Sequence, residues 1–257
     1  MILNQRKEIA LSLLDTFKDA GNVALELRKK GLKKEIKSDN TPVTNGDIEV
    51  NNILTKKIST LTPEIPIISE ETSSNKKNEN LNNFWLIDPI DGTSSYINNK
   101  DEFTINAALI INKKPVLGVI NAPDKKRLFY SYAPSNSFEI VNNQEINLIN
   151  QKKKNINLIT AVSYSNELKP DILKLHKEFK VNKYQKMKSS LKFCVIAAGE
   201  FDLYIAEPRA CEWDIAAGHA ILEHAGGSIT DFNGNEILYG KPNFKNPSLI
   251  LKGKHFL

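Results

Sequence analysis

Apolar residues recur at helical spacing in several parts of the chain. Between residues 5 and 30 they return every three or four positions, and Gly31 ends the pattern. Similar spacing begins at Asp47, and further helical patterns occupy residues 170–179, 189–198 and 214–225. A membrane surface can favour such a pattern, but a helix that covers a protein core is its commoner cause. We therefore predict core-facing helices at these positions.

Shorter apolar runs, bounded by turn residues, predict strands. These runs occupy residues 66–69, 84–87, 103–111, 115–121, 127–132, 138–148, 156–162 and 201–206. The strand at 84–87 is expected to end at Asp88, because Pro89 has no N–H group for the next ladder hydrogen bond. The middle of the chain is thus predicted to be a sheet meander, and the part that follows an alternating α/β layer.

Polar segments separate these elements. Residues 37–47 and 72–83 are predicted to be surface loops. A further polar break at residues 150–155 is our candidate boundary between two subdomains. The N-terminal one, residues 1–150, would be α+β and would carry most of the acidic candidates below, and the C-terminal one, residues 151–257, would be α/β and complete the site.

Composition narrows the class of protein. The chain has 257 residues, of which 40% are hydrophobic and 25% charged, as is typical of a soluble globular protein. The net charge of +5 comes mostly from lysine, since arginine occurs only at positions 6, 28, 127 and 209. Base readout favours arginine, so this basicity does not indicate a nucleic-acid polymer as partner. It suits small anionic substrates.

The apolar runs and the cysteines indicate where in the cell the protein resides. No apolar run is long enough to cross a bilayer, and the charged residues Arg6, Lys7 and Glu8 interrupt the apolar positions that a secretory signal would need. Cys194 and Cys211 are the two cysteines, and we expect them to be free thiols in a reducing compartment. We therefore expect a cytoplasmic protein with no integral membrane segment.

Two predicted strands end in acidic residues. Asp88 and Asp91 follow the run at 84–87, and Glu70 follows the run at 66–69. If these strands are neighbours, their three carboxylates converge, which is unfavourable unless cations neutralise them. Carboxylate oxygens are ligands for hard cations such as Mg²⁺. The other interpretation of the central stretch, an acidic turn that only caps a helix, stays open.

Small residues follow the acidic turn. Gly92, Thr93 and Ser94 could begin a helix, and the free N–H groups of a helix start bind phosphate. Acids and amides on one turn suggest metal-assisted phosphate chemistry. Asp47 and Asp214 also lie at predicted helix starts. Either could be a simple cap; alternatively, Asp47 helps to deprotonate a water and Asp214 is a metal ligand from the second half.

Taken together, four stretches resemble the inositol monophosphatase superfamily of metal-dependent, lithium-sensitive phosphatases. They are Thr41-Pro42-Val43-Thr44 with Asp47, Glu70-Glu71, Asp88-Pro89-Ile90-Asp91-Gly92-Thr93, and Glu212-Trp213-Asp214 with Ala216-Ala217-Gly218. They follow the family order across nearly the whole chain. The resemblance implies a layered α-β-α-β-α sandwich, a small phosphorylated substrate and a site for two or three Mg²⁺ ions.

The resemblance also implies a role for each motif residue. Glu70, Asp88 and the carbonyl of Ile90 would hold the first ion, and Glu70 would also touch a third. Asp91 and Asp214 would join Asp88 at the second ion. Catalysis would depend on Glu70 and on Asp47 and Thr93, which would orient and activate the attacking water. The amides of Gly92, Thr93 and Ser94 would cradle the phosphate.

Two further stretches resemble the 3'(2'),5'-bisphosphate nucleotidase branch, which converts adenosine 3',5'-bisphosphate to AMP and phosphate. They are Ser189-Ser190-Leu191-Lys192-Phe193 and Lys37-x-Asp39-x-Thr41-Pro42-Val43-Thr44. Ser190 and Lys192 of the first stretch, together with Glu212 of the Glu212-Trp213-Asp214 motif, are our candidate substrate contacts. Thr41 and Gly46 depart from the usual Ser and Ala, and residues 206–211 match no substrate pattern.

Other functions stay open at this point. An inositol-1-monophosphatase, or a phosphatase for another sugar or alcohol phosphate, would have the same fold. A non-catalytic anion-binding protein with a relic site is the alternative from another class. The sequence is compatible with a monomer and with a homodimer.

Overall fold

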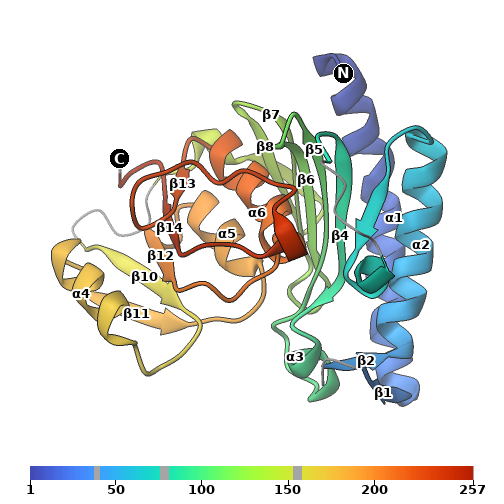
Figure 1. Ribbon diagram of the computed structural model, residues 1–257, viewed down its shortest axis with the longest axis horizontal. Coiled ribbons are helices and arrows are strands. Elements are labelled where there is room, and N and C mark those ends of the chain that lie inside the picture. The colour runs from blue at the N-terminus through green and yellow to red at the C-terminus, as the bar shows by residue number, and fades with distance from the viewer. Residues whose placement is uncertain (38–40, 76–80, 153–157, 257) are drawn as a thin grey trace.

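Five alternating layers of helix and sheet make up the protein (Figure 1). The computed structural model describes residues 1–37, 41–75, 81–152 and 158–256. Helices α1 (Leu3–Lys30) and α2 (Asn45–Leu61) cover a seven-stranded sheet, whose other face packs on α5 (Leu191–Ala197) and α6 (Glu212–His224). A five-stranded sheet and α4 (Pro170–Glu178) complete the stack. The predicted α-β-α-β-α sandwich is confirmed.

The seven-stranded sheet has the order β3-β4-β5-β6-β7-β8-β9. The β3–β4 pair is parallel, and the pairs from β4–β5 to β8–β9 are antiparallel. The strands are β3 (Ile67–Ser69), β4 (Phe84–Asp91), β5 (Thr104–Ile111), β6 (Lys114–Ala122), β7 (Arg127–Ala133), β8 (Asn136–Val141) and β9 (Gln144–Asn147). The predicted strand at 138–148 is thus a hairpin. Asn142 and Asn143, both with positive φ, form its two-residue turn.

The prediction that the central strand ends at Asp88 is wrong, because β4 continues through Pro89 to Asp91. Asp88 pairs with Asn106 and Asp91 with Thr104, so three steps along β4 face two along β5. A bulge of this kind lets proline lie in a strand without breaking the ladder around it. The bulge also brings Asp88 and Asp91 to the same end of the sheet.

The five-stranded sheet has the order β11-β10-β12-β14-β13. Its strands are β10 (Thr160–Ser163), β11 (Lys183–Lys186), β12 (Leu203–Ala206), β13 (Ser228–Thr230) and β14 (Leu249–Lys252). A small third sheet joins β1 (Lys34–Ile36) to β2 (Pro42–Thr44). The sequence analysis did not predict β1, β2, β11, β13 or β14. These strands have three or four residues, and β11 is an exposed polar edge without apolar alternation.

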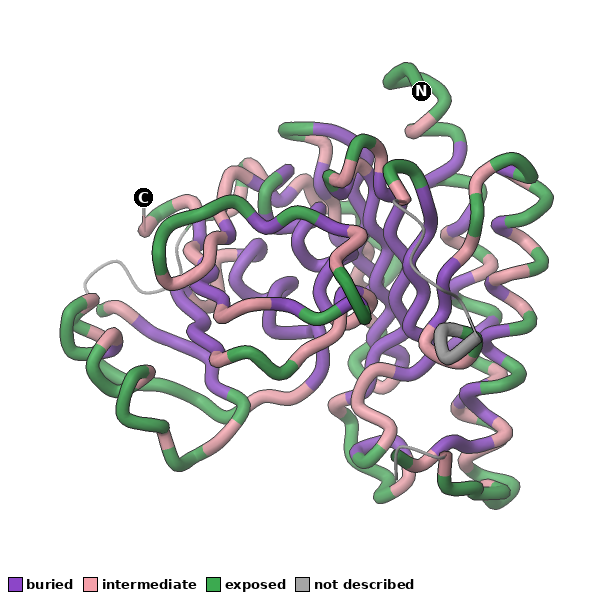
Figure 2. The backbone as a smooth tube through the Cα atoms, in the orientation of Figure 1, coloured by how far each residue is buried: buried purple, intermediate pink, exposed green. Residues whose placement is uncertain are grey.

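Both faces of the seven-stranded sheet are buried (Figure 2). Phe17 of α1 and Leu54 of α2 belong to the core on one face, and Phe193 of α5 and Ile221 of α6 belong to the core on the other. The second core includes residues from both sheets, so residue 150 separates the two sheets but not two cores. Division into two subdomains stays a prediction, and residues 153–157 of the polar break lie outside the described residues.

Cys194 and Cys211 are free thiols, as predicted. Of the helices that the structure describes, none combines the length and hydrophobicity of a membrane span.

Candidate metal and phosphate site

Three carboxylates from two layers meet at one end of the seven-stranded sheet. Asp88 and Asp91 come from β4, and Asp214 comes from the first turn of α6. One oxygen from each lies within 4.8 Å of the other two. Asp214 Oδ2 also accepts a hydrogen bond of 2.7 Å from the N–H of Cys211, which fixes the carboxylate at the start of the helix. The predicted convergence of acids from the two halves is therefore present.

The electrostatics of this cluster favour a bound cation. Burial raises the pKa of all three aspartates, and the pKa of Asp214 reaches about 7. At Asp88 and Asp214 the neighbouring negative charges raise the pKa further. Asp88 is 1% exposed, and its Oδ1 has no hydrogen-bond partner among the described residues. A buried carboxylate oxygen without a donor, beside two further carboxylates, is the donor set that a divalent cation such as Mg²⁺ requires.

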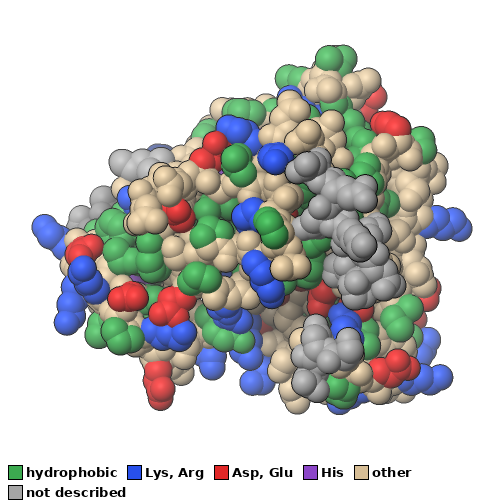
Figure 3. All heavy atoms as spheres, viewed as in Figure 1, with side chains coloured by type: hydrophobic (Ala, Val, Ile, Leu, Met, Phe, Trp, Pro, Cys, Tyr) green, Lys and Arg blue, Asp and Glu red, His purple; other side chains and the backbone are tan. Residues whose placement is uncertain are grey.

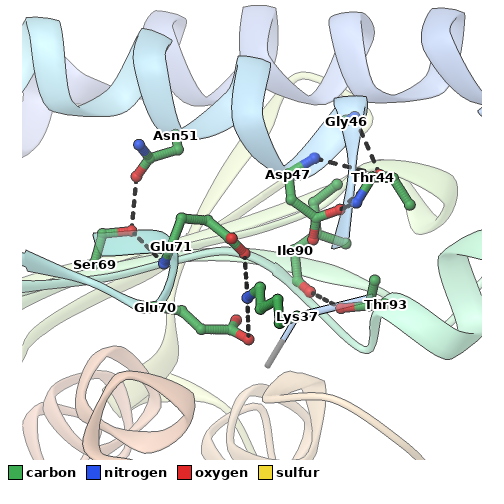
Figure 4. A network of polar contacts seen from close by, with 10 residues as sticks. All are labelled: Lys37, Thr44, Gly46, Asp47, Asn51, Ser69, Glu70, Glu71, Ile90 and Thr93. Atoms are coloured by element: carbon green, nitrogen blue, oxygen red, sulfur yellow. Dashed lines mark hydrogen bonds and ion pairs between the residues drawn. The ribbon is translucent and has the colours of Figure 1, made fainter. Parts of the chain in front are cut away.

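Glu70 lies beside this cluster but outside the three-carboxylate group. It begins the 3₁₀-helix Glu70–Asn75, which directly follows β3. Figure 4 shows the ammonium of Lys37 between Glu70 and Glu71, with Nζ–Oε1 distances of 3.3 Å and 2.9 Å. Glu70 is still close enough to raise the pKa of Asp88. Its predicted role as a metal ligand stays a prediction.

Asp47 closes the first turn of α2. Its Oδ2 accepts hydrogen bonds from the N–H (2.8 Å) and the hydroxyl (2.6 Å) of Thr44, the N-cap residue (Figure 4). The capping role left open by the sequence is therefore present. Burial nevertheless raises the pKa of Asp47 to about 6, against the effect of these hydrogen bonds. A carboxylate with such a pKa can also accept a proton from water, so the two roles are compatible.

The turn after β4 places the predicted phosphate-binding amides. Gly92 has φ +90°, and a Cβ atom there would lie 3.0 Å from the carbonyl oxygen of Glu102, so both conformation and space favour glycine. The short helix α3 (Thr93–Ile97) begins next. The first N–H groups of a helix, here those of Thr93 and Ser94, have no intrahelical partner. Thr93 Oγ1 donates to the carbonyl of Ile90 at 3.1 Å, beside Asp47 (Figure 4). Their roles toward phosphate and water stay predictions.

Ser190 and Lys192, at the start of α5, lie next to Asp91 and Asp214. The N–H of Ser190 donates to Asp91 Oδ2, and its hydroxyl donates to Asn106 Oδ1 at 2.7 Å. Ser190 thereby connects the start of α5 to the end of β4. Lys192 is 6% exposed, and its Nζ lies 5.3 Å from the centre of the Tyr204 ring. Burial lowers the pKa of Lys192 to about 8, although Asp91 acts in the opposite direction.

Glu212 is fully buried and binds other parts of the chain. Its two oxygens accept hydrogen bonds from the N–H groups of Gly240 (2.8 Å) and Lys241 (2.9 Å), and the Lys241 ammonium lies 2.7 Å away. The residue thus fastens the segment after β13 to the start of α6. Its predicted contact with substrate stays a prediction.

The sequence analysis missed some residues around the acids. Lys37 was quoted only as part of a motif, and Tyr164 and Arg209 were not selected at all. Both of the latter line a cavity that also reaches Asp91, Asp214 and Lys192. The scarcity of arginine in this chain was the one signal that could have singled out Arg209.

The model of the inositol monophosphatase family matches residues 5–255. The 3'(2'),5'-bisphosphate nucleotidase CysQ of Buchnera aphidicola is 38% identical over 86% of this chain and 84% of that protein.

Two solved structures show the same fold. CysQ from Bacteroides thetaiotaomicron, a bacterial member of the inositol monophosphatase family, has a TM-score of 0.76 and 28% identity and covers 95% of this chain and 97% of its own. An IMPase/NADP phosphatase complexed with Mg²⁺ and phosphate has a TM-score of 0.77 and 21% identity over 98% of this chain and 92% of its own.

Proposed function

Since the chain belongs to the inositol monophosphatase family, we propose that it is a Mg²⁺-dependent phosphomonoester hydrolase that converts adenosine 3',5'-bisphosphate to AMP and phosphate. The observation that carries this proposal is the meeting of Asp88, Asp91 and Asp214 beside a cavity that also contains Lys192. The name of the Buchnera relative supports the choice of a 3'(2'),5'-bisphosphonucleotide as substrate.

Two or three Mg²⁺ ions would be held by the three aspartates, Glu70 and the carbonyl of Ile90. The IMPase/NADP phosphatase that shares this fold was solved with Mg²⁺ and phosphate, which supports the choice of metal. Bound Mg²⁺ supplies charge that stabilises the phosphoryl and leaving oxygens and lowers the pKa of a coordinated water.

The chain's own groups would then position the ester and the water. Asp47, whose pKa is raised to about 6, takes the proton of a water that the Thr93 hydroxyl orients. Amides of Gly92, Thr93 and Ser94 donate to the phosphoryl oxygens. On the far side, Ser190 and Lys192 hold the rest of the substrate, and Glu212 supports that side through the segment it binds.

We further infer a cytoplasmic location, in keeping with the two free thiols, and inhibition by lithium, in keeping with the family resemblance. The protein would act as a monomer or a homodimer.

Phosphate release from a panel of esters tests the proposal. With MgCl₂, adenosine 3',5'-bisphosphate should be hydrolysed faster than inositol 1-phosphate, and EDTA should abolish release from both. Faster turnover of inositol 1-phosphate would favour an inositol monophosphatase instead. Binding of the esters without any phosphate release would support the non-catalytic alternative.

A further inference from the structure

Tyr96 is a buried residue of α3 that the proposed mechanism does not use. It follows the turn of Gly92, Thr93 and Ser94, here called the phosphate turn, whose amides would hold the phosphoryl oxygens. The N–H of Tyr96 donates to the carbonyl of Gly92 at 3.0 Å, and its hydroxyl donates to the carbonyl of Ala24 at 2.7 Å. Ala24 belongs to α1. Tyr96 therefore joins the phosphate turn to the layer of α1 and α2.

The ring of Tyr96 also lies against the first turn of α2. A Cβ atom at Gly46 would lie 2.5 Å from the hydroxyl oxygen of Tyr96 and 2.8 Å from a carbon of its ring. The φ of Gly46 is not positive, so space, and not backbone conformation, requires glycine at this position. Alanine, the usual residue of the family motif here, fits only if the ring shifts. The presence of Tyr96 thus explains why Gly46 departs from the motif.

Gly46 directly precedes Asp47, the proposed base. The Thr44 hydroxyl accepts from the N–H groups of Gly46 (3.1 Å) and Asp47 (3.4 Å), so both residues belong to one capped turn (Figure 4). Burial raises the pKa of Tyr96 to about 12, and the nearby charge of Asp47 contributes to the shift. Its hydroxyl therefore stays protonated and remains a donor to Ala24. Tyr96 contacts both the phosphate turn and the start of the helix that carries the base.

A buried arginine of α1 packs on the same ring. The guanidinium carbon of Arg28 lies 5.6 Å from the centre of the Tyr96 ring and 5.3 Å from that of Phe103, and the two rings are 4.9 Å apart. Many Lys and Arg side chains lie at the surface, as along the edge between the ends of β11 and α3 (Figure 3). The side chain of Arg28, in contrast, is 12% exposed and pairs with Asp124 at 2.6 Å. Packing on several sides therefore fixes the position of the tyrosine.

We propose that Tyr96 is a positioning residue, which sets the distance between the phosphate turn and Asp47 and so aligns the attacking water with the phosphoryl group. The inference deepens the proposed function and rests on its hydrolytic reaction, but not on the choice of nucleotide. Attack requires the base, the water and the ester to be placed correctly, and a displacement of about 1 Å can lower turnover by about 100-fold. One rigid ring that contacts both groups can maintain this placement.

A double-variant cycle at residues 46 and 96 tests the role. It measures kcat, with MgCl₂, for the ester of the panel that the wild type hydrolyses fastest. Gly46→Ala places a methyl group against the Tyr96 hydroxyl and should lower kcat by about 30-fold or more. Tyr96→Phe removes the hydroxyl and its bond to Ala24 and should lower kcat by about threefold. In the double variant the untethered ring can move aside, so kcat should return to about the value of Tyr96→Phe alone.

Calorimetric binding of inorganic phosphate, with MgCl₂, distinguishes positioning from general damage to the site. The dissociation constant should change by less than about threefold in all three variants, because the phosphate turn keeps its own geometry. A weakening of phosphate binding as large as the loss of kcat would overturn the inference.

Tyr130→Phe is the matched control. It removes a buried tyrosine hydroxyl that donates to Glu145 at 2.6 Å, on β7, three strands away from β4. It should leave kcat unchanged. A loss of kcat as large as that of Tyr96→Phe would reject the special role of Tyr96.

The wild-type activity separates this inference from the proposed function. If the wild type hydrolyses no ester of the panel, the proposed function fails and the positioning role fails with it. If the wild type is active but the double variant is no faster than Gly46→Ala, only the inference fails. Tyr96→Phe adds no atom, so its kcat decides the question should Gly46→Ala not fold: a loss of about threefold supports the role, and an unchanged kcat overturns it.

Discussion

Asp88, Asp91 and Asp214 oppose folding when no cation neutralises them. Asp88 is buried, Asp91 and Asp214 are half-buried, and each has a raised pKa. Their positions at the ends of a strand and at a helix start could be predicted, because the signals are local: an apolar run followed by acids, and an acid in a first helical turn. The partners Lys37 and Arg209 could not, because their contacts depend on how loops distant in sequence pack together.

The first prediction concerns pH. In an unfolded chain an aspartate ionises near pH 4, whereas in the folded, metal-free protein Asp214 stays protonated to about pH 7. The folded state therefore binds more protons between these values, and its stability falls as pH rises through this window. Thermal unfolding in EDTA should give a higher Tm at pH 5 than at pH 8. With MgCl₂ the difference should shrink or reverse, because the metal binds the ionised carboxylates. A metal-free Tm that rises over the same interval would contradict this.

The second prediction concerns Asp91→Asn. Replacing one ligand of the cluster should lower kcat for adenosine 3',5'-bisphosphate by about 100-fold or more. The same change removes one of three crowded charges, while the asparagine carbonyl can still accept from the N–H of Ser190. The metal-free variant should therefore have a higher Tm than wild type at pH 8. Asp15→Asn, at an exposed site on α1, is the matched control for both measurements. Near-normal turnover of the Asp91→Asn variant would show that Asp91 is not a metal ligand.

At the scale of elements, the site depends on how closely α6 approaches the seven-stranded sheet. A Cβ atom at Gly118 of β6 would lie 2.3 Å from the carbonyl oxygen of Ala217, in α6. Asp214 is one turn earlier on this helix, so its distance from Asp88 and Asp91 depends on the same packing. The sequence predicted the small residues of α6 but not their partner on the sheet. Likewise, Pro89 suggested a strand end because a bulge depends on the neighbouring strand as well as on local sequence.

The third prediction follows from this contact. Gly118→Ala should destabilise the protein by about 1–3 kcal/mol in denaturant unfolding, because backbone must shift to admit the methyl group. It should also weaken Mg²⁺ binding, since α6 carries Asp214. Gly253→Ala is the control, because there the nearest atom, of Ile196, is 3.3 Å away. Equal free energies of unfolding for Gly118→Ala and Gly253→Ala would show that α6 can move away from the sheet without destabilising the protein.

The fourth prediction concerns the attachment of the C-terminal segment to α6. Glu212→Gln removes the charge that faces two backbone N–H groups and the Lys241 ammonium, and it replaces one acceptor by a donor. Breaking a buried network of this kind should destabilise the protein by about 2–4 kcal/mol in urea. Glu236→Gln changes an exposed ion pair and should alter stability by less than about 1 kcal/mol. If both variants lower the free energy of unfolding by the same amount, Glu212 does not fasten the C-terminal segment to α6.

At the scale of the whole molecule, the acids join two layers that share one core. The layer order was predictable from the resemblance and from the alternation of strands and helices. The five-stranded sheet was predicted only in part, because its order β11-β10-β12-β14-β13 combines strands that are far apart in sequence and have only three or four residues each. A ligand that bridges β4 and α6 should therefore stabilise the fold as a unit.

The fifth prediction measures that coupling. Mg²⁺ at 100 times its dissociation constant should add about 2.7 kcal/mol of stability if it binds only the folded state. For a chain of this length, that corresponds to a rise in Tm of about 5–10 °C. Asp91→Asn should show a much smaller rise. A Tm that does not change with Mg²⁺, with or without inorganic phosphate, would contradict a metal site at this junction.

The core between the two sheets also governs how the protein is made. When the ribosome has delivered residues 1–150, α1 and α2 can already cover one face of the seven-stranded sheet. The opposite face, with Phe84, Ile110 and Phe129, has to wait for α5 and α6. Until then the nascent chain exposes a broad apolar surface that attracts chaperones or other unfinished chains. A truncated product that ends near residue 150 should aggregate when it is expressed alone. It should stay soluble when residues 151–257 are expressed in the same cell.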